Sequence, residues 1–170
     1  MPRLISAKVL GYFLILAVLD VSVIPAIHLG AARPILLYLV VIYAGFEWHW
    51  TKTLPVTVGV GLVRDFLSSQ LFGIEAASLV TVSFGFNFFI QKVQTSGLGV
   101  RMVGTFLFVF LTLNLTIILQ DLLGKELSLT GALLSSYFLS ALLTALLMPF
   151  FFMLTRRWFQ ERHPLRSYSG

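Results

Sequence analysis

Six long apolar runs, separated by short polar breaks, dominate this chain. Hydrophobic residues make up 58% of its 170 residues and charged residues only 11%, whereas soluble domains carry about a quarter charged residues. A chain of this length cannot bury so much apolar surface in one aqueous core, so lipid must be the solvent for much of it. The composition therefore predicts an all-α integral membrane protein, with a single domain over residues 1–170.

The apolar runs predict a bundle of about six transmembrane helices joined by short loops. The first run contains Asp20 and is longer than the hydrophobic region of a signal peptide, so we expect an uncleaved helix. Pro34 and Pro55 are expected in the first turns of the second and third helices, where the missing N–H costs no hydrogen bond. The predicted spans are residues 9–29, 35–46 or 35–48, 54–69, 76–90, 102–119 and 131–154.

Lysine and arginine are distributed unevenly between the two sides of this predicted bundle. The termini and the second and fourth loops hold nine of them, against Arg33 and Lys125 on the other side. The positive-inside rule then places both termini, and a short basic tail at about residues 156–170, in the cytoplasm. Because the basic residues follow topology and form no basic helix, the net charge of +5 does not indicate nucleic-acid binding.

Two adjacent charges interrupt the third run, in the stretch Gly59–Leu79. Charged side chains at membrane depth cost a few kcal/mol each, so they usually face protein or trapped water. Arg64 and Asp20 are expected at similar depth, and we predict a buried ion pair between them, with Asp65 satisfied separately near the outer loop. The alternative is that Arg64 extends alone to the lipid headgroups. Gly73 is expected to turn the chain and Glu75 to open the fourth helix.

Asp20, Asp65 and Asp121 each follow a short aliphatic run on an odd-numbered helix. This recurrence is compatible with an internal repeat of helix pairs. The mid-helix amides Asn87 and Asn114 are expected to form internal hydrogen bonds, and a ligand role is the alternative.

Small residues at four-residue spacing allow helix backbones to approach closely in lipid. Each such row can serve packing within the bundle or seat another protein's helix. Internal packing is the preferred interpretation for the fourth helix, whereas both stay open for the sixth. The rows are Ala77, Thr81 and Gly85 on the fourth helix, and Ala132, Ser136, Ser140 and Thr144 on the sixth.

Catalytic motifs are missing from the sequence. His28, His49 and His163 stand at loops or interfaces, and no HExxH, GxSxG or P-loop pattern occurs. The absence of cysteine removes thiol nucleophiles and cysteine metal sites. We therefore expect no enzyme, no metal and no cofactor; an enzyme acting on lipid-linked sugars would have only Asp20, Asp65 and Asp121 as candidate acids.

The charged stretch resembles the hairpin signature of the MreD family of bacterial rod shape-determining proteins. The matching residues are Gly61, Leu62, Asp65, Gly73, Ala77 and Leu79. The likeness is strongest over residues 55–92 and extends to the chain length, the short loops and the basic tail. It implies a protein of the bacterial inner membrane and of the cell-elongation machinery, with MreC as partner and, through it, MreB, RodA and a class B penicillin-binding transpeptidase. It also implies a fold like that of the S components of energy-coupling-factor vitamin transporters.

These observations together predict a non-enzymatic membrane scaffold that binds MreC. The rival is an S component that captures a vitamin-like ligand in a cavity near the outer face, although the short outer loops offer few polar groups for it. The residues expected to hold the structure or a partner are Asp20, Arg64, Asp65, Gly73, Glu75, Ala132, Ser136, Ser140 and Thr144.

Overall fold

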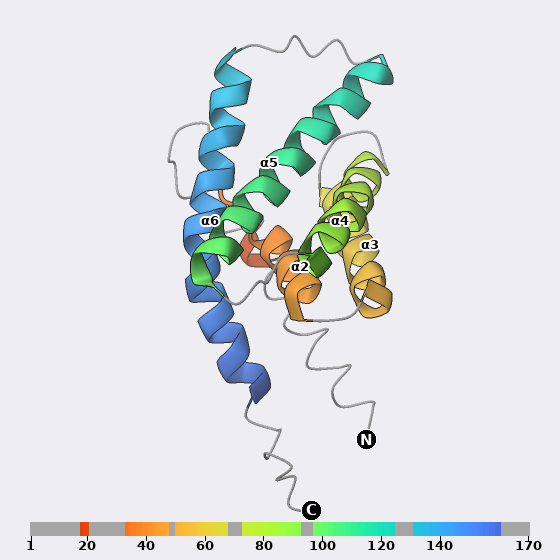
Figure 1. The fold of residues 1–170 in the computed structure, drawn as a ribbon. Helices are drawn as coiled ribbons and strands as arrows, with labels where there is room; N and C mark the ends of the chain where they lie inside the picture. The colour runs from red at the N-terminus through yellow and green to blue at the C-terminus, as the bar shows by residue number, and fades with distance from the viewer. Residues whose placement is uncertain are drawn as a thin grey trace, which may run out of the picture.

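The computed structural model describes residues 18–20, 33–47, 50–67, 73–92, 97–124 and 131–160, and these are helical except for short connections (Figure 1). No strand occurs within these ranges, so the predicted all-α class is confirmed. Residues 18–20 are helical within the predicted first span, and the rest of that span lies outside the described residues. The other described helices are α2 (Leu36–Glu47), α3 (Trp50–Leu67), α4 (Ile74–Lys92), α5 (Leu98–Leu122) and α6 (Gly131–Gln160).

The helix boundaries follow the predicted spans, with four corrections. Pro34 lies two residues before α2 and not in its first turn, and α5 begins at Leu98 and not at residue 102. Helix α3 begins at Trp50, so Pro55 lies in its second turn and not in its first. Thr53, in the part of α3 that precedes the predicted start, is buried and donates a hydrogen bond to the carbonyl of Ala44. Helix α6 continues to Gln160, beyond the predicted start of the tail, because no glycine or proline ends it after Leu154.

Helix α2 is the centre of the bundle. It contacts α3, α4, α5 and α6, and these four pack against one another in chain order. Seven of the 12 residues of α2 are buried and only Glu47 is exposed, as expected for a helix that is apolar on all sides. Its 12 residues extend only about 18 Å at 1.5 Å per residue, less than the roughly 30 Å of a bilayer's hydrocarbon core. The first backbone N–H groups of α2 therefore need partners inside the protein.

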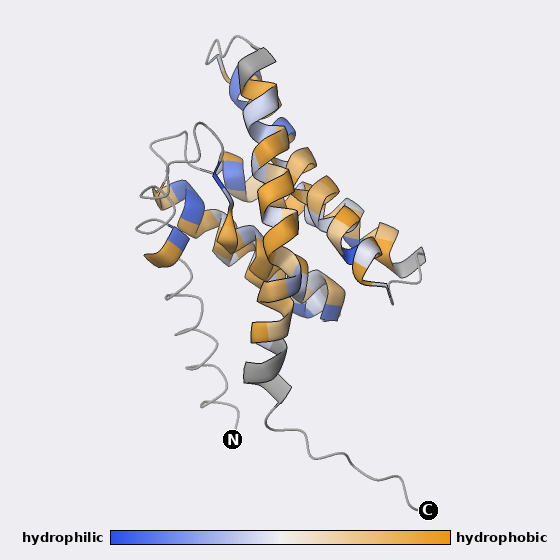
Figure 2. Cartoon of the chain, turned by 90° about the vertical axis from the view of Figure 1, so that its left-hand side faces the viewer, coloured by the Kyte–Doolittle hydropathy of each residue, from blue (hydrophilic) through white to orange (hydrophobic). Residues whose placement is uncertain are grey.

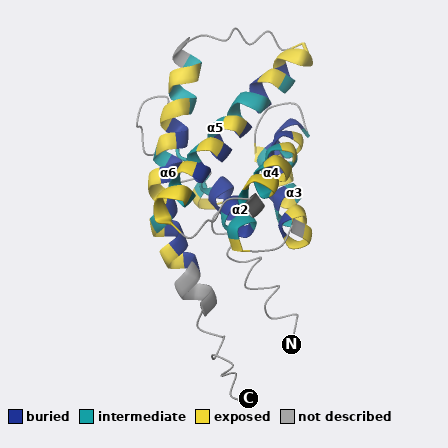
Figure 3. Ribbon diagram, in the orientation of Figure 1, coloured by how far each residue is buried: buried dark blue, intermediate teal, exposed yellow. Residues whose placement is uncertain are grey.

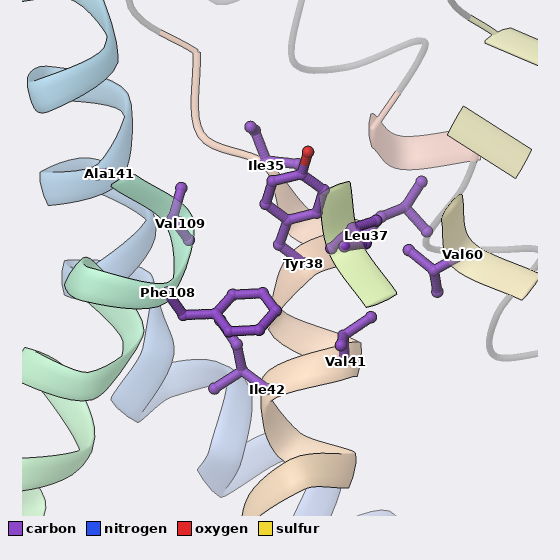
Figure 4. Close-up of a cluster of buried hydrophobic side chains, with 10 residues drawn as sticks. Ile35, Leu37, Tyr38, Val41, Ile42, Val60, Phe108, Val109 and Ala141 are labelled. Atoms are coloured by element: carbon purple, nitrogen blue, oxygen red, sulfur yellow. The ribbon is translucent and has the colours of Figure 1, made fainter. Parts of the chain in front are cut away.

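Aromatic and aliphatic side chains of α2 meet apolar side chains of α3, α5 and α6 (Figure 4). Tyr38 of α2 and Phe108 of α5 meet edge to face, with ring centroids 6.5 Å apart, and both are almost fully buried. Gly104 lets α5 approach this cluster, since a Cβ there would lie 3.3 Å from ring atoms of Phe46 and Phe86. The core thus joins α2, α4 and α5.

The outside of the bundle is apolar, as its core is (Figures 2 and 3). Large apolar side chains face outward, including Phe66, Phe84 and Phe150, which are 77%, 65% and 63% exposed. Buried hydroxyl side chains lie inside, and several donate to the carbonyl four residues earlier in their own helix, so they need no water. These include Thr57, Ser78, Thr105, Thr112 and Thr144.

Two described segments are long and apolar enough to cross a membrane by length and composition. They are Leu98–Leu122, which is all of α5, and Leu133–Thr155 within α6. Helix α2 and residues Ile74–Ile90 of α4 are apolar but shorter.

Candidate functional site

Four charged side chains meet where α3 ends and where α2 and α4 begin. We call Asp20, Arg64, Asp65 and Glu75 the charged cluster. Arg64 donates from Nε to Oε2 of Glu75 at 2.5 Å and from Nη2 to Oε1 at 3.2 Å, which is a two-bond pairing of guanidinium and carboxylate. Both side chains are mostly buried, with 19% and 9% of their surface exposed. This pair closes the hairpin of α3 and α4.

Asp65 caps the N-terminus of α4. Its Oδ1 accepts the backbone N–H of Glu75 at 3.0 Å, and its Oδ2 accepts that of Ala76 at 3.1 Å. The first N–H groups of a helix have no partner within the helix, and the positive end of the helix dipole favours a carboxylate. Asp65 therefore has partners other than Arg64, at the start of α4.

Gly73 makes this cap possible. Its φ of +95° lies in the left-handed region, which a side chain disfavours, and its carbonyl accepts the N–H of Ala77 at the start of α4. The predicted turn at Gly73 and the predicted helix start at Glu75 are therefore both correct, with α4 beginning at Ile74.

Asp20 lies in the same cluster. Its Oδ2 is 3.7 Å from Nη1 of Arg64, so the predicted contact between these two residues is confirmed. Its Oδ1 accepts the backbone N–H of Leu36, the first residue of α2, at 2.8 Å. Because Arg64 contacts two carboxylates of the protein, the alternative of an arginine that reaches the headgroups alone is not observed.

The sequence analysis missed one member of this site, Tyr38, and did not predict the pairing of Glu75, which it had named. Glu75 was expected to open α4, but not to be the closest partner of Arg64. Tyr38 was not singled out, although the Cζ atom of Arg64 lies 4.8 Å from its ring centroid. The turn predicted at Gly73 brings the chain back toward Arg64, and this could have indicated Glu75 as a partner of Arg64. Tyr38 stands within an apolar run, and no pattern marks it.

The small-residue row of α6 serves packing within the bundle. Ser140 and Thr144 are buried, and their hydroxyl groups accept the backbone N–H groups of Arg33 and Ile35, just before α2. Ser136 lies one turn earlier, and its carbonyl accepts the hydroxyl of Ser140. Ala132 lies in the first turn of α6, and its side chain is outside the described set.

The corresponding expectation for α4 is wrong. Ala77, Thr81 and Gly85 are exposed and face away from the bundle, and a Cβ placed on Gly85 would meet no atom within 4 Å. The reason is that α4 packs on its neighbours through other faces, with Ser78 and Leu79 fully buried. Thr81 satisfies its own hydroxyl by donating to the carbonyl of Ala77.

The other residues considered for chemistry do not join the charged cluster. Asp121 is exposed in the last turn of α5. His28, His49 and His163 lie outside the described residues. Among the described residues, no group of three or more His, Cys, Asp or Glu side chains could hold a metal ion. Asn114 donates to the carbonyl of Phe110 in its own helix, as expected of an internal amide.

Comparisons of the chain with protein-family models, with curated proteins and with solved structures give no match.

Proposed function

We propose that this chain is a non-enzymatic scaffold of the bacterial inner membrane, similar to the MreD family, that helps maintain rod shape and side-wall peptidoglycan synthesis by binding MreC. The observation that carries the proposal is that the side chains of the charged cluster bind one another and helix N-termini. Arg64 and Glu75 pair with two hydrogen bonds, and Asp65 is occupied by two backbone N–H groups. A scaffold needs such groups for geometry and not for reaction.

The residues that carry the resemblance to this family have structural tasks here. Gly61 lies against the backbone of Ala76, at a close contact between α3 and α4. Asp65 caps α4, Gly73 supplies the left-handed turn, and Leu79 is fully buried. A signature made of a close contact, a cap, a turn and a core residue specifies a helix hairpin. This supports a fixed hairpin shape as the basis of the proposed function.

The multi-pass topology with cytoplasmic termini belongs to the same proposal. The outward apolar faces and the inward hydroxyl groups suit a bundle dissolved in lipid. Since the chain has no cysteine, labelling of single cysteines introduced at each terminus and in each loop shows directly on which side of the membrane each one lies. We expect impermeant maleimide to label cysteines at residues 3 and 166 only from the cytoplasmic side; labelling from outside would contradict the topology.

The exposed row of α4 is the face on which a partner helix can approach most closely. Ala77, Thr81 and Gly85 leave the backbone open, and Phe84 and Phe88 stand exposed on the same helix. Small residues at four-residue spacing allow two helix backbones to pack in lipid, where dispersion contacts and close approach drive association. We therefore place the transmembrane helix of MreC on α4. The row on α6 is already used within the bundle.

Co-purification tests the proposed function. We expect the chain to retain MreC in mild detergent, and Gly85→Leu to weaken this association at least tenfold while the melting temperature stays unchanged. Leu146→Ala on the exposed face of α6 is the matched control. Failure of the wild-type chain to retain MreC would contradict the scaffold. Tight binding of a vitamin in native mass spectrometry, with no MreC bound, would favour the transporter subunit instead.

A further inference from the structure

Five helix ends meet at one end of the bundle. Helices α2, α4 and α6 finish there, and α3 and α5 begin there (Figure 1). Thr53 of α3 donates to the carbonyl of Ala44 of α2. Arg101 of α5 lies over the rings of Phe46 of α2 and Phe152 of α6. We call this region, which lies opposite the charged cluster, the basic end.

The described charges are divided unequally between the basic end and the rest of the bundle. The basic end holds five basic residues and one acidic residue, so five positive charges less one negative leave a formal charge of +4. They are Lys52, Lys92, Arg101, Arg156 and Arg157, with Glu47. The other described charges are two basic and four acidic residues, which leave −2. They are Arg33 and Arg64, with Asp20, Asp65, Glu75 and Asp121.

The basic residues of this end stand at the border of the outward apolar surface. On each of four helices, an exposed apolar side chain lies within about one turn of a basic residue. The pairs are Lys52 with Leu54, Lys92 with Phe88, Arg101 with Val103 and Arg156 with Met153. Lysine and arginine at such a border keep their stems on apolar surface and their charges at the headgroups. The same border fits a phospholipid, whose phosphate lies above its acyl chains.

We propose that the basic end binds anionic phospholipids, with phosphate groups beside Lys52, Lys92, Arg156 and Arg157 and acyl chains along the exposed apolar faces. Charge complementarity favours an anionic headgroup, because each basic residue near such a surface adds about fivefold in affinity. Arg101 contributes less, since its Nη1 lies 3.3 Å from Oε1 of Glu47. Lipids fit better than an acidic protein, because the basic residues are spread over four helices and each adjoins apolar surface.

Native mass spectrometry of the full chain in detergent tests this proposal, with phosphatidylglycerol and phosphatidylcholine of identical acyl chains as probes. We expect the wild type to bind phosphatidylglycerol at least about tenfold more tightly. Lys52→Gln with Lys92→Gln should reduce this preference at least about fivefold. The matched control is Arg33→Gln with Lys125→Gln, which removes two positive charges away from the basic end and should keep the preference. An equal reduction in both double variants, or none in the first, would overturn the assignment.

Arg156→Gln with Arg157→Gln is a second variant of the basic end, in case the first does not fold, and we expect the same reduction. The inference rests on the proposed membrane location but not on MreC. The two probes distinguish these claims. Equal binding of both lipids by the wild type would overturn the anionic-lipid surface and leave the membrane location intact. Retention of neither lipid would overturn both.

Discussion

At the scale of single residues, a carboxylate that caps the next helix occurs twice. Asp65 accepts the first N–H groups of α4, and Asp20 accepts the N–H of Leu36 at the start of α2. Each aspartate precedes the helix that it caps, which agrees with the predicted recurrence of acids on odd-numbered helices. Asp121, the third of these acids, is exposed at the end of α5. One side chain thus fixes where α2 begins and another where α4 begins.

Replacement of Asp65 by alanine leaves two N–H groups of α4 without an acceptor. We expect a loss of about 2 kcal/mol in the free energy of unfolding, near the upper end for a lost helix cap. Asp65→Asn keeps one acceptor oxygen, so its loss in the free energy of unfolding should be smaller. Denaturation in mixed micelles, followed by circular dichroism, measures both values. The control Asp121→Ala, at an exposed site, should stay within about 0.5 kcal/mol of the wild type; an equal loss in both variants would contradict the cap.

At the scale of elements, the backbone just before the short central helix α2 depends on α6 for its hydrogen-bond acceptors. The segment before α2 donates to Ser140 and Thr144, and α2 then continues with all its sides covered. Irregular backbone at membrane depth is tolerated only where protein or trapped water satisfies it. The polar row of α6 supplies those acceptors, which is why it faces inward.

Thr144→Val removes the acceptor of the Ile35 N–H while it keeps the side-chain shape. We expect a cost of about 1–3 kcal/mol, because a buried backbone donor is left unsatisfied. Thr81→Val is the matched control, since the hydroxyl of Thr81 bonds only within exposed α4. The measurement is the free energy of unfolding of the two variants. An equal loss in both would show that Thr144 acts by packing alone.

Helices α3 and α4 are in close backbone contact at Gly61. A Cβ there would lie 2.5 Å from the Cα of Ala76, so the backbones must separate. We expect Gly61→Ala to cost about 1–3 kcal/mol by overpacking. Gly85→Ala adds the same methyl group where no atom lies within 4 Å, and it should leave the melting temperature unchanged. A neutral Gly61→Ala would contradict the close contact.

At the scale of the whole molecule, hydropathy predicted the positions of the helices well. The length of the apolar runs defines α2, α4, α5 and α6 because burial in lipid or protein favours the same residues. The similar depth of Asp20 and Arg64 on neighbouring helices was enough to predict their contact. The orientation of each helix about its axis was not predictable in the same way. Polar and apolar residues are spread evenly around the axis of α4, so its sequence does not distinguish the face with Leu79 from the face with Gly85.

The sequence also did not predict how Arg64 divides its hydrogen bonds. Depth along a helix places Asp20 near Arg64, but the turn at Gly73 decides that Glu75 receives two of its N–H groups. That choice depends on three-dimensional contacts that a linear pattern does not contain. Tyr38 was missed for the same reason, since only the assembled bundle brings its ring against Arg64.

The central claim is that the charged cluster locks α3 to α4, and a double-mutant cycle on Arg64 and Glu75 tests it most directly. Arg64→Met alone leaves a buried carboxylate without its partner, and we expect a loss of about 3–5 kcal/mol in the free energy of unfolding. Glu75→Met in the same chain should restore much of that loss, with a coupling energy of at least about 1 kcal/mol. Strictly additive losses in the double variant would contradict the claim.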